Sequence, residues 1–182
     1  RRQRQMCIRD RHKPNYMEMT YPSWTYQGRI FTDILDFPKG TYGFIYEVYH
    51  KPSGLKYLGK KVLRFERNKK LGKRALEALR EERKANGIGG RTPLKQKIIT
   101  ESDWKDYYGS HPKIKQLVKD STDLRLDFER KILDLVPNKK LLTYYECKHL
   151  FINDVLEEYS HQYINDNILG KFYRKDFNYE TK

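Results

Sequence analysis

Long apolar runs and cysteines are scarce in this chain, and each scarcity excludes a class of protein. No stretch of 18 or more residues is apolar throughout, so the sequence predicts no membrane-spanning helix and no membrane partner. The N-terminus lacks the apolar centre of a secretory signal. Cys7 and Cys147 are the only cysteines, and neither belongs to a CxxC pair, which excludes a disulfide framework and a CxxC-based zinc site. We therefore expect a cytoplasmic protein with two plain thiols.

Aromatic residues, by contrast, are plentiful. They make up 14% of the 182 residues, and 37% of the chain is hydrophobic, which is enough for one domain with a packed core. We expect residues 1–16 to be a non-native or disordered arm, because the opening RRQRQMCIRDR fits neither a helix nor a strand period; a genuine basic arm that contacts nucleic acid is the alternative. Residues 17–42 are aromatic-rich and broken by Pro22, Gly28 and Pro38, so we expect a lead-in that packs on the domain.

Positive charge is concentrated in one segment. The whole chain has a net charge of +14, and residues 60–97 contain fourteen basic and four acidic residues, whereas residues 98–182 contain fourteen and fifteen. A block this basic is typical of a surface that binds a phosphate backbone, because each neutralised phosphate releases condensed counterions. The alternative is a solvated helix face, since Glu77, Glu81 and Glu82 allow ordinary helical charge pairs.

Two short runs, GFIYEVYH at 43–50 and LKYLGKKV at 55–62, predict a β-hairpin. The four residues KPSG between them suit a turn, with Pro52 presetting its own φ and Gly54 closing the loop. If residue 50 pairs with residue 55, Tyr46 lies opposite Gly59 and Tyr57 lies on the same face. The two tyrosines are then diagonal neighbours beside a position without a side chain, an arrangement that core packing alone does not explain.

The remaining chain predicts an α+β fold in which helices flank a small, mainly antiparallel sheet of three strands. Apolar spacing predicts a helix over 68–86, followed by a flexible loop over 87–96. A short helix should follow a cap at Ser110, with Pro112 in its first turn. Residues 124–135 predict the third strand, with a helix as the alternative. A helix should begin after the Asn138 cap and break near Asn153, and residues 161–177 are loop-like.

The hairpin resembles the paired signature of the GIY-YIG nuclease superfamily, in its bacteriophage-type form. FIY ends at Tyr46 and YLG begins at Tyr57, although phenylalanine stands where the family usually has glycine. Arg67 lies ten residues after Tyr57, Glu146 lies in the helix predicted after the third strand, and Asn165 stands in YIND. The resemblance covers about 43–167, with a basic helical insertion over about 74–100 and a C-terminal tail over 168–182.

The resemblance implies a site and a chemistry. Glu146 would hold Mg²⁺ or Mn²⁺, which would stabilise the phosphate and the leaving oxygen. Arg67 would bind the same phosphate with its forked donors. Tyr46 would orient or deprotonate the attacking water, and Tyr57 would hydrogen-bond the water or the phosphate. Asn165 would close the site, with its neighbour at position 167 as a competitor for that role.

Two positions of the family pattern remain open. Because the insertion lengthens the interval before the glutamate, Arg64 or Arg74 could replace Arg67. The histidine that usually follows the arginine is not evident, and Lys73 and His111 are the substitutes available.

The resulting hypothesis is a metal-dependent DNA endonuclease, encoded by a phage and acting in the cytoplasm of its bacterial host. Residues 60–97 would bind the DNA backbone, largely without reading bases, although the insertion could read bases. The expected DNA-binding residues are Lys60, Lys61, Arg64, Lys69, Lys70, Lys73 and Arg74. The alternatives are a non-catalytic DNA-binding module of the same fold and a phage structural or assembly protein. Oligomeric state is left open.

Overall fold

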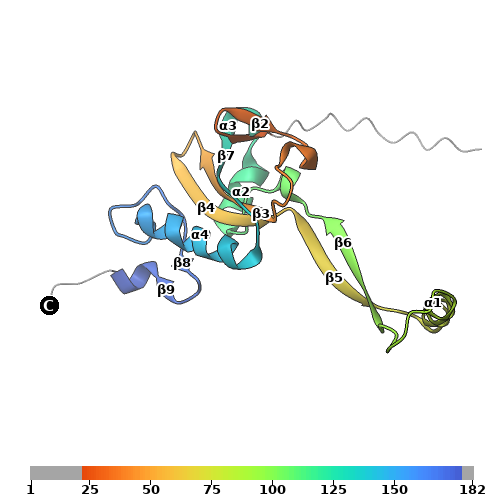
Figure 1. The fold of residues 1–182 in the computed structure, drawn as a ribbon. Helices are drawn as coiled ribbons and strands as arrows, with labels where there is room; N and C mark the ends of the chain where they lie inside the picture. The colour runs from red at the N-terminus through yellow and green to blue at the C-terminus, as the bar shows by residue number, and fades with distance from the viewer. Residues whose placement is uncertain (1–21, 178–182) are drawn as a thin grey trace, which may run out of the picture.

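The central element is a twisted five-stranded sheet, described by a computed structural model that covers residues 22–177 (Figure 1). Its strand order is β2-β1-β7-β3-β4. The strands are β1 (Trp24–Tyr26), β2 (Arg29–Phe31), β3 (Gly43–His50), β4 (Leu55–Val62) and β7 (Phe128–Val136). All neighbours are antiparallel except β1 and β7. The α+β class and the mainly antiparallel sheet are confirmed, and the prediction for residues 1–16 lies outside the described residues.

The prediction of three strands was wrong, because the lead-in is part of the sheet. β1 and β2 form a tight hairpin around Gln27 and Gly28, whose φ angles are +48° and +78°. Positive φ at both central residues is what a two-residue hairpin turn needs to match the twist of its strands. β1 then pairs with β7, and the side chain of Trp24 is almost fully buried.

The predicted hairpin forms with the predicted register. β3 and β4 pair along their whole length, with His50 opposite Leu55, Val48 opposite Tyr57 and Tyr46 opposite Gly59. β4 is the edge strand of the sheet, so its outer side is accessible to other segments. The tyrosine pair therefore lies beside the sheet edge.

Each face of the sheet carries its own apolar cluster. One face packs Phe44, Tyr46 and Val48 against Trp104 and Ile114, the latter from helix α2 (Pro112–Asp120). The other face packs against helix α4 (Lys139–Ile152), through the cluster Ile45, Leu58, Val136, Leu142 and Leu150. Because side chains alternate along a strand, neighbouring residues of β4 reach opposite layers.

The residues that cap the helices determine where the observed helices agree with the predicted ones and where they differ. Asn138 caps α4 by accepting a hydrogen bond from the Leu141 amide, and the helix ends at Asn153, both as predicted. α2 is capped by His111 rather than Ser110. The predicted strand over 124–135 begins only at Phe128, because Asp123 caps the one-turn helix α3 (Leu124–Asp127) in front of it.

The basic insertion is a ribbon with a helix rather than a helix and a loop. Strand β5 (Arg64–Lys70) pairs with β6 (Lys95–Glu101), and α1 (Lys73–Ala85) connects them. The helix predicted over 68–86 therefore begins five residues late, and the end of the predicted loop belongs to a strand. We call residues 64–101 the arm; it projects from the body and carries α1 at its far end (Figure 1).

The described end of the chain folds back onto the body. It contains the two-residue strands β8 (Asn167–Ile168) and β9 (Phe172–Tyr173) and a 3₁₀ turn, η3 (Arg174–Phe177). Two further 3₁₀ turns lie earlier in the chain, η1 (Ile34–Asp36) and η2 (Trp104–Asp106). The Arg174 guanidinium donates to the carbonyls of Tyr163 (2.8 Å) and Asn165 (3.3 Å). Within residues 22–177, no helix has the length and apolarity to cross a membrane.

Candidate active site

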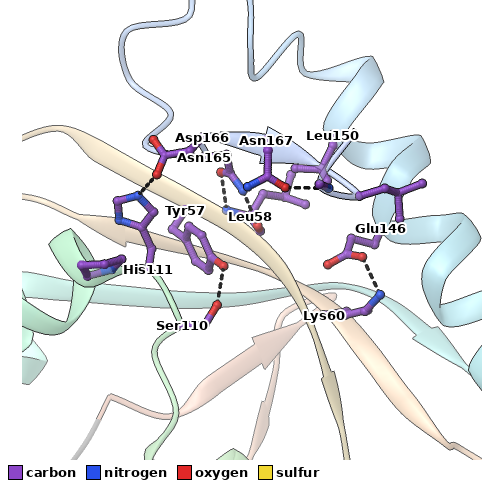
Figure 2. A pocket seen from close by; sticks show the side chains of 13 residues that line it. Tyr57, Leu58, Lys60, Ser110, His111, Glu146, Leu150, Asn165, Asp166 and Asn167 are labelled. Carbon is purple, nitrogen blue, oxygen red and sulfur yellow. Dashed lines mark hydrogen bonds and ion pairs between the residues drawn. The ribbon is translucent and has the colours of Figure 1, made fainter. Parts of the chain in front are cut away.

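The candidate site is a cavity of about 420 Å³ at the edge of the sheet. Four segments line it: β4, the chain at the start of α2, α4 and the chain on either side of β8 (Figure 2). The polar side chains among its lining residues are Tyr57, Lys60, Ser110, His111, Glu146, Asn165, Asp166 and Asn167. Residues more than a hundred positions apart in the sequence thus meet at one place.

Tyr46 lies beneath Tyr57, further from the cavity, and not beside it. Tyr46 is 1% exposed and does not line the cavity, whereas Tyr57 does. Their ring centroids are 6.2 Å apart. A β-carbon added to Gly59 would lie 2.7 Å from the Tyr46 hydroxyl oxygen and 3.3 Å from Cε1 of Tyr57. The position without a side chain is therefore filled by the Tyr46 ring, which supports the more accessible Tyr57.

Both phenols are held in the protonated form. Burial raises the pKa of Tyr46 well above its usual value, and the neighbouring Tyr57, Tyr107 and Glu146 raise it further. Burial also raises the pKa of Tyr57, partly opposed by its hydrogen bond with Ser110. A phenol with a raised pKa donates a hydrogen bond but is a poor base near neutral pH. The raised pKa values disfavour proton abstraction by either tyrosine, and only Tyr57 lies where its hydroxyl can orient a ligand in the cavity.

A tight loop fixes the ring of Tyr57. Its hydroxyl lies 3.1 Å from the hydroxyl oxygen of Ser110. Gly109 has a φ of +144°, and a β-carbon there would come within 2.7 Å of the Tyr57 ring. Only glycine suits a position that combines this backbone conformation with such close contact. Ser110 was predicted only as a helix cap, and the glycine before it in YYGS is the sequence feature that accompanies its contact with Tyr57.

Glu146 projects from α4 into the cavity and pairs with Lys60 of β4 (Figure 2). The Glu146 carboxylate lies 2.7 Å from the Lys60 ammonium, which also donates to the Thr143 hydroxyl at 3.1 Å. Lys60 is the only lysine or arginine among the residues that line this cavity. Glu146 and Lys60 therefore form a carboxylate–cation pair inside the cavity.

His111 and Asp166 form a second polar pair on the other side of Tyr57. The His111 Nε2 lies 2.8 Å from the Asp166 carboxylate, and its Nδ1 accepts from the Lys113 amide at 3.1 Å. An Nδ1 that accepts requires the neutral tautomer to carry its proton on Nε2, which then donates to Asp166. The His111 ring centroid lies 6.0 Å from that of Tyr57. His111 was one of two substitutes left open for the family histidine; Asp166 was missed, although it adjoins Asn165.

Asn165 binds the backbone of β4. Its side chain accepts from the Leu58 amide at 3.1 Å and donates to the Leu58 carbonyl at 2.8 Å. Leu58 lies between Tyr57 and Gly59 on the edge strand, where backbone groups would otherwise lack partners. The side chain is 6% exposed. Asn165 therefore positions the strand that carries the tyrosine.

The predicted arginine lies elsewhere. Arg67 is an exposed residue of β5 opposite Ile98, and neither it nor Arg64 or Arg74 lines the cavity. The remaining expected DNA-binding residues of the arm, Lys69, Lys70 and Lys73, are exposed as well.

Lys61 differs from the other expected DNA-binding residues because it is buried. Its ammonium pairs with Asp103 at 2.8 Å and lies 3.4 Å from the centroid of the Tyr107 ring. Burial lowers the pKa of Lys61, against the opposing effect of Asp103. These contacts leave no free ammonium for a phosphate.

The donor set suits a hard cation held mainly by water. Across the described residues 22–177, no three His, Cys, Asp or Glu side chains gather into a metal-binding group. Magnesium, however, is commonly held by one or two carboxylates together with substrate phosphates and several waters. Glu146 supplies one such carboxylate in an open cavity, so the residues fit that mode of binding, with Lys60 as a competitor for the same oxygens.

Comparison with known proteins gives one result that bears on this geometry. A search of curated proteins and a search of solved structures returned no match. A family model described as "Putative endonuclease segE, GIY-YIG domain" matches residues 24–168. The match begins at β1 and ends at β8, so it contains the sheet, the arm and every polar side chain that lines the cavity. The chain belongs to this GIY-YIG endonuclease family.

Proposed function

We propose that this protein is a metal-dependent DNA endonuclease that hydrolyses phosphodiester bonds in the cavity at the edge of β4. One observation carries the proposal: Tyr57, supported from beneath by Tyr46, shares a cavity with the Glu146 carboxylate. Membership of an endonuclease family supplies the class of reaction. The cofactor would be Mg²⁺ or Mn²⁺, held by Glu146 and water.

Each residue of the cavity has a task in this proposal. Tyr57 and Ser110 orient the attacking water or the phosphate through their hydroxyls. Lys60 contacts the scissile phosphate, a role that the family resemblance implied for Arg67, with Arg64 or Arg74 as alternatives. A divalent ion on Glu146, when bound, would neutralise the negative charge that develops on the phosphate and the leaving 3′ oxygen. Tyr46 and Asn165 hold Tyr57 in place without touching the substrate.

The proton acceptor that we assign is the His111–Asp166 pair. An imidazole can act as a general base, and the Asp166 carboxylate fixes the tautomer of His111 whose Nδ1 carries the free lone pair. Nε2 already carries the proton that it donates to Asp166, so only Nδ1 can accept another. The hydrogen bond from the Lys113 amide to Nδ1 must therefore open when DNA binds. Catalytic hydrogen bonds are often rearranged in this way between the free enzyme and its substrate complex.

A non-catalytic DNA-binding module is the second candidate, and a specific observation favours it. Arg67 lies outside the cavity, and the Glu146 carboxylate is already paired with Lys60. In a protein that only binds DNA, this ion pair would replace the metal permanently.

Plasmid cleavage separates the two candidates. Supercoiled plasmid is incubated with wild type, Glu146→Gln or Tyr57→Phe, with Mg²⁺, with Mn²⁺ or with a chelator. Glu158→Gln is the matched control, because Glu158 is exposed and lies outside the cavity lining. We expect nicked or linear plasmid only with metal, cleavage by Glu158→Gln at the wild-type rate, and loss of cleavage with retained DNA binding in Glu146→Gln. Wild type that binds plasmid and leaves it intact with both metals would establish the second candidate.

A further inference from the structure

No residue of the arm lines the cavity, yet the arm is the most basic part of the described protein. Residues 64–101 contain twelve basic and five acidic residues. Every residue of β5 and β6 is exposed, and α1 buries none. A two-stranded ribbon without a hydrophobic partner is only marginally stable by itself. Such a surface indicates a binding partner rather than a structural role.

The two faces of the ribbon differ in chemistry. Paired residues of antiparallel strands share a face, so the register places Phe65 with Thr100, Arg67 with Ile98, and Lys69 with Gln96 on one side. We call these six residues the reading face. It contains two cations and no carboxylate, and its two apolar side chains are 37% (Phe65) and 36% (Ile98) exposed.

The opposite face includes acidic groups. Glu66 pairs with Lys97 at 2.7 Å on this side, and Glu101 lies opposite Arg64. Ile99, next to Ile98 in sequence, points to this face. The opposite face also carries the cations Arg64, Lys70, Lys95 and Lys97. Both faces therefore attract a phosphate backbone, and the reading face differs because it presents its cations without a carboxylate beside them.

We propose that the reading face lies in the major groove of duplex DNA and reads base edges, so that the arm selects where the cavity cuts. The major groove, about 12 Å wide, admits a two-stranded β-ribbon. Strands of seven residues span about 23 Å, which is long enough to cross it. This inference rests on the proposed function for its substrate, and it replaces the expectation that residues 60–97 bind mainly without reading bases.

The side chains of the reading face suit this task. Arginine and lysine pair with guanine, glutamine pairs with adenine, and threonine or an apolar side chain contacts the thymine methyl group. Arg67, Gln96 and Ile98 are one member of each class on a single face. The cations of α1, at the far end of the arm, are then available to contact the phosphates that flank the groove.

The first test places the same charge on either face. Ile98→Glu and Ile99→Glu change the net charge of the arm equally at adjacent positions, so long-range electrostatics affect both alike. Binding to a mixed-sequence 30-base-pair duplex is measured by fluorescence anisotropy in chelator, with circular dichroism as the check of folding. We expect Ile98→Glu to weaken binding about tenfold more than Ile99→Glu, within the range for one lost base contact. Equal weakening in folded variants would overturn the proposal.

The second test fills the groove instead of changing the protein. Wild type is bound to the same duplex with plain cytosine and with cytosine that carries a bulky 5-substituent, which projects into the major groove. We expect at least tenfold weaker binding to the substituted duplex, and equal affinity would overturn the groove assignment. Arg67→Ala should lower the difference in affinity between duplexes of different sequence. Because all binding is measured without divalent ions, failure of plasmid cleavage would leave these results unaffected.

Discussion

Replacement of Gly59 by alanine tests whether the buried tyrosine controls the site. The added β-carbon would lie 2.7 Å from the Tyr46 hydroxyl oxygen and 2.9 Å from its Cζ, against 3.4 Å for ordinary contact. The ring must therefore move by about 0.7 Å, and it packs against Tyr57 and Trp24. Overpacking of this kind costs about 1–3 kcal/mol of unfolding free energy.

The displacement should reduce catalysis more than stability. Because a misplacement near 1 Å can lower a rate by about a hundredfold, we expect plasmid cleavage by Gly59→Ala to fall by about one to two orders of magnitude. The assay compares cleavage rates with Mg²⁺ and urea unfolding midpoints in the same buffer. Wild type and a matched glycine variant, Gly72→Ala, are the references, since nothing lies within 4 Å of a β-carbon at Gly72.

A double variant tests the physical cause. Adding Tyr46→Phe to Gly59→Ala removes the hydroxyl that lies closest to the new β-carbon, so part of the lost stability should return. Cleavage at the wild-type rate by a folded Gly59→Ala would refute the reasoning, and so would a double variant whose stability loss is the simple sum of the two single losses.

Three further predictions concern other contacts of the site. Lys60→Gln removes the cation that competes for Glu146, so calorimetric titration should show several-fold tighter Mn²⁺ binding, and weaker binding would contradict the fit. Asn165→Ala leaves the Leu58 amide and carbonyl without their side-chain partner, the pair of hydrogen bonds that we call the clamp. It should lower the unfolding free energy by about 2 kcal/mol, measured in urea. An unchanged unfolding midpoint would show that the clamp does not stabilise the protein. The raised pKa of Tyr46 means that the unfolded chain loses this proton first. The contribution of Tyr46 to the unfolding free energy is therefore fully present below pH 10 and decreases above it. Tyr46→Phe should reduce the fall of the unfolding free energy with pH in this alkaline range by up to about 1.4 kcal/mol per pH unit.

The local sequence pattern was sufficient to predict the hairpin and its register. The pairing of strands that lie far apart in the sequence could not be predicted in this way. Alternation, Pro52 and Gly54 define β3 and β4 without help from the rest of the chain. β1 is only three residues long and gains its partner from β7, more than a hundred positions away. The arm was predicted as helix and loop, because residues 64–70 and 95–101 alternate poorly and pair with each other across α1. Pairing, rather than propensity, decides such strands.

The structure brings together those predicted residues that belong to recognisable local motifs. Tyr57, Glu146 and Asn165 meet at the cavity, and Tyr46 lies beneath it. Arg67 was placed by its distance along the sequence, and an inserted ribbon breaks the relation between that distance and position in space. His111 and Asp166 come together only through tertiary folding, 55 residues apart, and no local pattern signals that meeting.

The clamp of Asn165 on Leu58 joins positions 107 residues apart, and this has a consequence for the order in which the protein matures during synthesis. A chain that has emerged from the ribosome only as far as α4 already contains both tyrosines and the Glu146 carboxylate. Its edge strand still lacks the side chain that fixes it, and the Arg174 contacts that hold the clamp in turn have not formed. In the proposed nuclease, the strand that carries Tyr57 would therefore be fixed in place only after the closing segment docks.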